Sequence, residues 1–207
     1  MKIQAVLTGD IVNSTGLTTA IEKKLFRVVQ ELFIAHKVEF FRGDSFQVYV
    51  RDPKEALKLA LLSRTAAISL FKGEKLILSD IRISIGVGTV ETPVKTLRTA
   101  KGEAFLLSGR KFDEIAKSSR RLAIVAADPL AKEGLDIIAD YINSIFEGMT
   151  GKQAEVIFEL LKGEIQKGIA KKLRKTKSTI HQRIISGRWP EIERLLLHYE
   201  NIINLLK

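Results

Sequence analysis

Two Gly-Asp steps place carboxylates where predicted strands end or turn. Asp10 follows an apolar run over residues 3–7, and Asp44 lies between apolar runs over 38–41 and 45–50 that we predict to form a hairpin. In a sheet where these strands are neighbours, the two carboxylates converge. Mg²⁺ carrying a nucleoside triphosphate is usually held by one or two carboxylates together with phosphates and water. The pair therefore predicts a site for Mg²⁺ and a nucleoside triphosphate.

Ser14 and Thr15 stand just before a predicted amphipathic helix over about 17–35. Their hydroxyls and the free N–H groups of the helix N-terminus would suit phosphate. The alternative is ordinary turn chemistry, because Asp, Asn and Ser form caps and turns without any ligand. In that case Asp44 would simply pair with Arg42.

A second set of residues carries most of the positive charge. Residues 162–188 contain nine Lys and Arg residues and one acid, Glu164, so this segment holds +8 of the chain's +10. Phosphate attraction is local, since it is screened over roughly 8 to 10 Å, so such a cluster is typical of a nucleic-acid-binding module. The alternative is a solvated, lysine-rich face.

The spacing within this segment predicts a helix-turn-helix with helices over 165–173 and 177–186. Ile169, Ala170, Ile180 and Ile184 fall on the inward stripes. His181 and Gln182 could then reach base edges, with Gln favouring adenine, whereas lysines around the turn suit phosphates. The predicted DNA-contacting residues are Lys171, Lys172, Lys175, Lys177, Ser178, Thr179, His181, Gln182 and Arg183. The alternative is that this unit packs on another protein as an adaptor.

The elements that must position these residues follow the order β-α-β-β-α-β-α-β and then helices only. Strands are predicted over 3–7, 38–41, 45–50, 80–90 and 121–127, and helices over 17–35, 53–71, 102–117, 132–146, 151–161, 165–173, 177–186 and 190–205. This order predicts an α+β fold with a ferredoxin-like βαββαβ sheet, followed by an all-α helix-turn-helix domain. We divide the chain into 1–128, a connecting helix over 129–148, and 149–207.

Composition limits the remaining possibilities. The uneven charge of the 207 residues favours two separate cores. The absence of cysteine excludes disulfides, thiolate zinc sites and a cysteine nucleophile. No stretch approaches the roughly 20 apolar residues of a membrane span, so we expect a cytoplasmic protein that binds no membrane.

Four segments, 7–15, 42–50, 81–88 and 102–110, resemble in order and spacing the successive blocks of class III nucleotidyl cyclase catalytic domains. With the basic tail, the whole chain is similar to the SatD-type family, in which a cyclase-like domain precedes a DNA-binding-like tail. The resemblance implies that Asp10 and Asp44 bind Mg²⁺ and that Arg110 steadies the transition-state phosphate. The alternative for Arg110 is a surface ion pair with Asp113 or Glu114.

Two positions depart from the cyclase pattern. Leu106 replaces the transition-state asparagine, and Phe40 stands at the base-selecting position, with Glu39 one place out of register. Loss of one preorganised donor typically costs a factor of about 10² to 10³ in rate. We therefore expect a nucleotide- or metal-binding domain with little or no turnover and assign no catalytic residue.

These observations favour a dimeric DNA-binding transcriptional regulator whose front domain senses a nucleoside triphosphate with Mg²⁺ or dimerises. The alternatives are an active, Mg²⁺-dependent cyclase-type enzyme and a protein-binding adaptor.

Overall fold

A computed structural model describes residues 3–41, 43–71 and 79–206, without the side chain of residue 15. Arg42 and the hydroxyl of Thr15, both named above, lie outside this part. The sheet region comprises β1 (Ile3–Val12), α1 (Thr19–Leu32), β2 (Lys37–Phe41), β3 (Ser45–Val50), α2 (Glu55–Ser69), β4 (Asp80–Thr89), α3 (Glu103–Ile115) and β5 (Leu122–Ala126). The helices that follow are α4 (Pro129–Glu147), α5 (Gly151–Leu161), α6 (Gln166–Leu173), α7 (Lys177–Ser186) and α8 (Trp189–Leu205).

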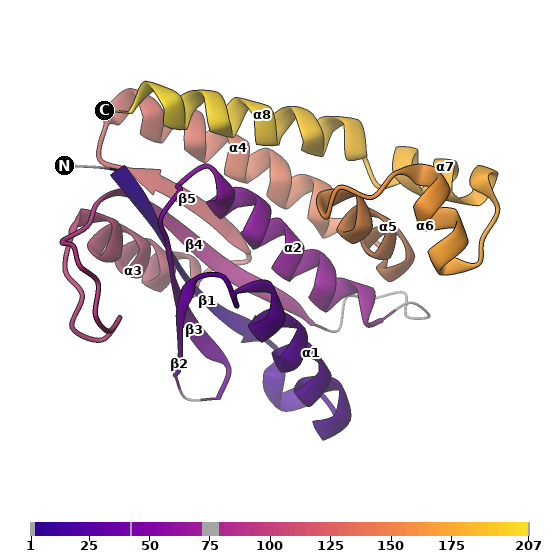
Figure 1. Cartoon of the computed structure of the whole chain (residues 1–207), viewed down its shortest axis with the longest axis horizontal. Helices are drawn as coiled ribbons and strands as arrows, with labels where there is room; N and C mark the ends of the chain where they lie inside the picture. The colour runs from indigo at the N-terminus through magenta and orange to yellow at the C-terminus, as the bar shows by residue number, and fades with distance from the viewer. Residues whose placement is uncertain (1–2, 42, 72–78, 207) are drawn as a thin grey trace.

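The fold is α+β, and its five strands form one sheet in the order β2-β3-β1-β4-β5. Neighbouring strands are antiparallel except β4 and β5, which are parallel. The crossover between β4 and β5 is α3, which lies on the opposite face of the sheet from α2 and α4 (Figure 1).

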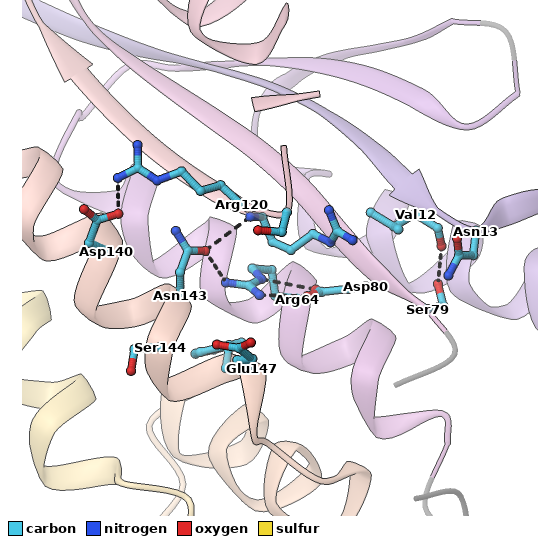
Figure 2. A pocket seen from close by; sticks show the side chains of 13 residues that line it. Val12, Asn13, Arg64, Ser79, Asp80, Arg120, Asp140, Asn143, Ser144 and Glu147 are labelled. Atoms are coloured by element: carbon cyan, nitrogen blue, oxygen red, sulfur yellow. Dashed lines mark hydrogen bonds and ion pairs between the residues drawn. The ribbon is translucent and has the colours of Figure 1, made fainter. Parts of the chain in front are cut away.

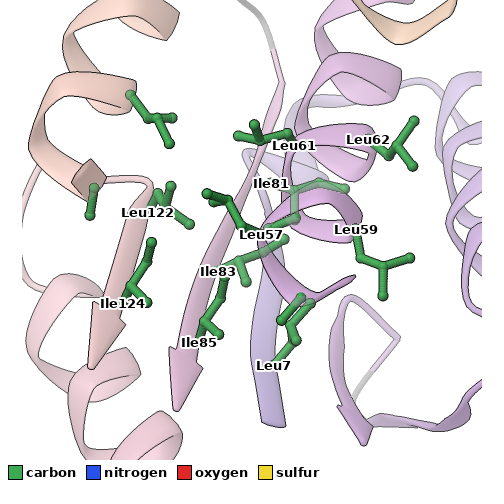
Figure 3. Close-up of a cluster of buried hydrophobic side chains, with 14 of the residues drawn as sticks. Leu7, Leu57, Leu59, Leu61, Leu62, Ile81, Ile83, Ile85, Leu122 and Ile124 are labelled. Carbon is green, nitrogen blue, oxygen red and sulfur yellow. The ribbon is translucent and has the colours of Figure 1, made fainter. Parts of the chain in front are cut away.

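The alternation of side chains gives the two faces of the sheet different chemistry. Figure 3 shows one apolar face packed against α2, with the labelled residues Leu7, Ile81, Ile83, Ile85, Leu122, Ile124, Leu57 and Leu61. The other face carries polar side chains in register, including Thr8 opposite Ser84 and Asp10 opposite Arg82. Asp10 therefore points away from the main core.

Glycine lets α3 approach the sheet. A Cβ at Gly86 would lie 2.3 Å from the Ala104 carbonyl oxygen and 2.5 Å from the Ser108 nitrogen. The absence of a side chain at this position thus sets the distance between α3 and β4.

The main core is continuous from the sheet to the last helix. The cluster that contains Leu7 and Phe46 also contains Ile157 of α5 and Ile192 of α8. The Tyr199 hydroxyl of α8 is buried and donates a hydrogen bond of 2.7 Å to the Pro53 carbonyl. The expectation of two separate cores is therefore wrong, because α5 and α8 bury their apolar stripes against α2 and α4. Helices α6 and α7 share a small cluster with α5, formed by Val156, Ile169, Ala170 and Ile180, and another small cluster lies on the α3 side of the sheet.

The first strand is longer than predicted. It runs through Gly9 and Asp10 to Val12 and pairs with β4 along its whole length. Ile11 and Val12 are buried and continue the strand beyond the polar step. Asp10 therefore lies inside β1 and not at its end. Among residues 3–41, 43–71 and 79–206, no helix has the length and apolarity that crossing a membrane requires.

Candidate functional site

Asp10 and Asp44 lie close together because β1 and β3 are neighbours. Asp10 is opposite Ser45, and the Ile11 N–H donates to the Asp44 carbonyl at 3.1 Å. The two carboxylates also interact electrostatically, since the negative charge of Asp44 is one of the causes that raise the pKa of Asp10. The described residues contain no cluster of three or more acidic or histidine side chains suited to a metal, so this carboxylate pair is the candidate.

Arg82 was missed by the sequence reasoning and alters this site. Its Nε lies 3.2 Å from Asp10 Oδ1, and both side chains are largely buried. Neither atom has an aligned hydrogen bond in the part of the chain that the structure describes, so the contact is an ion pair without good hydrogen-bond geometry. Burial raises the pKa of Asp10, and the nearby Arg82 charge partly opposes that rise. Any divalent cation at Asp10 has to share this carboxylate with Arg82.

Ser14 bonds to Asp44 and does not stand at the start of α1. Its Oγ donates to Asp44 Oδ2 at 2.9 Å, and Ser45 Oγ donates to Asp44 Oδ1 at 3.2 Å. Helix α1 begins only at Thr19, after the N-cap Thr18, whereas residues 14–16 form a separate short 3-10 turn. The expectation that Ser14 and Thr15 stand at the N-terminus of this helix is therefore wrong, while their role in phosphate binding stays a prediction. Their backbones precede the free N–H groups of α1 by several residues.

Phe40, which stands at the base-selecting position of the cyclase pattern, and the adjacent Glu39 lie on opposite faces of the sheet. Phe40 packs on Phe26 and Phe46 on the apolar face, with ring centroids 4.6 and 6.1 Å away. Glu39 points to the opposite face, where it accepts a bond of 2.8 Å from the Leu97 N–H and pairs with Arg98. Phe40 thus cannot reach a ligand on the face that carries Asp10.

Arg110 and Leu106 are exposed on α3. The alternative pairing of Arg110 with Glu114 is not observed, because Glu114 bonds to Lys111 at 2.8 Å. That hydrogen bond also lowers the pKa of Glu114. Among the described side chains, none lies within ion-pair distance of Arg110, so its role stays a prediction.

Local signals mark several helix boundaries in the basic tail. Thr150 and Gln153 form a capping box at the start of α5. Arg174, directly after α6, has φ 52° and ψ 48°, a left-handed conformation that ends the helix. The Thr176 side chain then caps α7 by accepting from the Thr179 N–H at 3.1 Å. We call α5, α6 and α7 the basic helical unit.

Most of the predicted DNA-contacting side chains are exposed on α6, α7 and the turn between them. Exposed residues are Lys171, Lys172, Lys175, Lys177, Ser178, His181 and Gln182, while Thr179 is half-buried. Sequence reasoning missed Ile185, which is also exposed and continues the outward face of α7. Its spacing of three and four residues from Gln182 and His181 was the available signal.

Two of the predicted DNA-contacting residues, Lys172 and Arg183, have carboxylate partners. Arg183, expected to face outward, is only 15% exposed and lies 3.7 Å from Glu155 of α5. This correction follows from the helical period, because position 183 faces α5 as Ile180 does. Lys172 remains accessible, but it bonds to the buried Glu159 at 2.6 Å.

No protein-family model and no curated protein matches this sequence. Two solved structures of bacterial light-regulated adenylyl cyclases are similar to the chain. One is 18% identical with a TM-score of 0.39, over 59% of this chain and 74% of that one. The other is 17% identical with a TM-score of 0.40, over 59% of this chain and 42% of that one. Similarities this low do not establish an activity.

Proposed function

We propose that the protein binds double-stranded DNA through α6 and α7, acting as a helix-turn-helix with α7 in the major groove. The observation that carries this proposal is a group of exposed cations around the turn. Lys171, Arg174, Lys175 and Lys177 have no carboxylate within ion-pair distance among the described residues. Unpaired, exposed cations at the N-terminus of an exposed helix are suited to phosphates, which fix the helix in register with the groove.

The outward face of α7 offers the side chains for base contacts. Ser178, His181, Gln182 and Ile185 are exposed at helical spacing. Gln can bond adenine through two groups, and an apolar side chain can contact the thymine methyl group. The proposed operator half-site is therefore rich in A·T pairs.

The test is fluorescence anisotropy with labelled duplex DNA over a salt series. Four phosphate contacts per protomer predict a log-log salt slope of about −3.6. The variant Lys175→Gln/Lys177→Gln removes two of them and should lower the magnitude of the slope by about 1.8. A matched control is Lys23→Gln/Lys24→Gln, which neutralises two exposed lysines on α1.

An unchanged slope in Lys175→Gln/Lys177→Gln would contradict the DNA proposal. Absence of duplex binding at low salt would favour the adaptor, in which the same face contacts protein.

We further propose that the first four strands with α1 and α2 form a ferredoxin-like unit that binds a nucleotide with Mg²⁺. Asp10 and Asp44 would hold the cation, which would bridge the phosphates. The raised pKa of Asp10 supports this. A cation bound by the two neighbouring carboxylates would lower both the free-energy cost of burying the Asp10 charge and the repulsion between the two charges. Arg82 already neutralises part of that charge, so the expected metal affinity is modest.

Isothermal titration with Mn²⁺, with and without a nucleoside triphosphate, tests this second site. Asp44→Asn should abolish the heat of binding, whereas Asp113→Asn, an exposed change on α3, should leave it unaltered. Equal Mn²⁺ binding by both variants would refute the site. Turnover of a nucleoside triphosphate that Asp44→Asn abolishes would instead favour the cyclase-type enzyme.

A homodimer fits both proposals, since helix-turn-helix proteins usually read two half-sites. Helix α4 exposes Leu130 and Ile137, side chains suited to a second copy. Sedimentation velocity at several concentrations would detect this dimer.

A further inference from the structure

A cavity of about 490 Å³ lies between the C-terminal half of α4 and the ends of β1, β4 and β5 that face it (Figure 2). Three arginines line it, Arg64 from α2 and Arg120 and Arg121 from the segment directly before β5. Asp10, Asp44 and Ser14 do not line it. The cavity therefore shares none of these residues with the carboxylate site, although the charges of Arg121 and Asp10 interact, and its volume is in the range of pockets for small molecules.

Arg64 lines this cavity and has a buried charge partner. Its side chain is 2% exposed, and Nε and Nη2 donate to the two carboxylate oxygens of Asp80 at 3.1 and 2.7 Å. Nη1 lies 3.5 Å from Asn143 Oδ1, and the guanidinium stacks 4.4 Å from the centre of the Phe146 ring. Asp80 thus pairs with the Arg64 charge, and three of the five N–H groups of Arg64 already have acceptors, which indicates a structural role.

Arg120 is also neutralised, by two carboxylates of α4. Its Nη2 donates to Asp140 and lies 3.3 Å from Asp136. These contacts tie the start of β5 to α4 and place Asp140 at the rim of the cavity (Figure 2).

Arg121 differs from its two neighbours. No carboxylate in the described chain lies within ion-pair distance of it, although its side chain is half-buried. Burial lowers its pKa, as do the nearby charges of Arg82 and Arg64, while the charges of Asp80 and Asp10 partly oppose this shift. A cation held in a cavity beside like charges has an unfavourable free energy unless an anion joins it.

We propose that this cavity binds a small organic phosphate, with Arg121 as the residue that contacts the phosphate group. A guanidinium can donate two parallel hydrogen bonds to phosphate oxygens, and Ser119 and Ser144 are among the residues that line the same space. The volume exceeds that of a phosphate ion, which leaves room for an organic group beside α4. Asn143 and Glu147 also line it, and α5 begins at Gly151, so the ligand would bind next to the connection to the basic helical unit.

The experiment is isothermal titration of the full chain in EDTA, so that no divalent cation engages Asp10 and Asp44. The probes are inorganic phosphate, adenosine 5′-monophosphate and adenosine. We expect the two phosphate compounds to bind and adenosine not to bind. Arg121→Gln should weaken phosphate binding at least tenfold, and Arg121→Lys less, because lysine keeps the charge but lacks the bidentate fork.

A thermal melt of each ligand-free variant separates binding from folding. Arg121→Gln should melt at the same or a higher temperature than the parent, since it removes an unpaired, half-buried charge. The control Arg27→Gln, an exposed change on α1, should alter neither property. Undetectable phosphate binding at about 10 mM, or equal phosphate affinity in the parent and Arg121→Gln, would overturn the proposal.

Discussion

Asp80 accepts three hydrogen bonds at the start of β4. Two come from Arg64, and the third comes from the Ile81 N–H at 2.7 Å. Both charged side chains are almost completely buried, so each charge is stabilised mainly by the other and not by water. The pair connects α2 to the sheet beneath the cavity.

We expect Asp80→Asn to lower the free energy of unfolding by about 3–5 kcal/mol, because it leaves the Arg64 charge buried without a partner. Urea unfolding followed by circular dichroism measures this value. The control Asp113→Asn on exposed α3 should change it by less than about 0.5 kcal/mol. A loss below 1 kcal/mol in Asp80→Asn would mean that water solvates Arg64 and that the pair is not structural.

Arg174 illustrates a conflict between stability and the proposed function. Its left-handed conformation is unfavourable for a residue with a Cβ, whereas glycine adopts it without that cost. We expect Arg174→Gly to raise the free energy of unfolding by about 1 kcal/mol and to weaken DNA binding by removing one phosphate contact.

Arg188 provides the comparison for this prediction. It is also left-handed, at φ 57°, but it bonds to Glu191 and to the Tyr141 hydroxyl. Arg188→Gly should therefore stabilise less than Arg174→Gly in the same urea titration. A destabilised Arg174→Gly would show that its side chain makes contacts that outweigh the backbone cost.

At the scale of elements, the position of α3 on the sheet depends on Gly86. We expect Gly86→Ala to lower the free energy of unfolding by about 2–3 kcal/mol, because the new methyl group would overlap the backbone of α3. Gly109→Ala is the matched control within α3 itself. No atom lies within 4 Å of a Cβ at that position, so alanine should stabilise by about 0.5–1 kcal/mol through helix propensity.

Hydrogen exchange can locate the effect of Gly86→Ala. Faster exchange should be concentrated in α3 and β4. Uniformly faster exchange across the chain, with α3 no more affected than α8, would argue that the glycine does not set this contact.

The individual elements could be predicted because their signals are local. The bounds of α5, α6 and α7 and the inward positions Ile169, Ala170 and Ile180 follow from apolar residues that are only a few positions apart in the chain. The pairing of Asp10 with Arg82 could not be predicted, because it depends on the register between β1 and β4, which are separated in the chain by α1, β2, β3 and α2. The cavity around Arg121 is assembled from four segments of the sheet region and α4, and periodicity does not reveal such an arrangement.

The difference between local signals and long-range packing also explains two wrong expectations, the outward position of Arg183 and the two separate cores. Charge along the sequence separates the basic segment from the rest, but packing follows the apolar stripes. Those of α5 and α8 face the sheet region. Glu155, which pairs with Arg183, belongs to α5 and lies outside the segment that the charge count singled out.

At the scale of the whole molecule, the continuous core has a direct consequence for unfolding. Tyr199 bonds to Pro53 across most of the chain, and Trp189 packs at the edge of the same cluster as the sheet. Trp189 is the only tryptophan, so its fluorescence reports on the start of α8, while far-ultraviolet circular dichroism reports on all helices and strands. Elements that share one core should lose their structure together.

We therefore expect the two signals to give the same urea midpoint, in a single transition. Coincidence of independent probes is the standard test of two-state unfolding. Tyr199→Phe removes the hydroxyl that bonds to the Pro53 carbonyl. It should lower the free energy of unfolding by about 1–3 kcal/mol, since the buried carbonyl loses its donor, and shift the midpoints of both signals equally to lower urea concentration. If the fluorescence midpoint fell well below that of circular dichroism, α8 would detach while the sheet stayed folded, and the helices after Asp128 would form an independent domain after all.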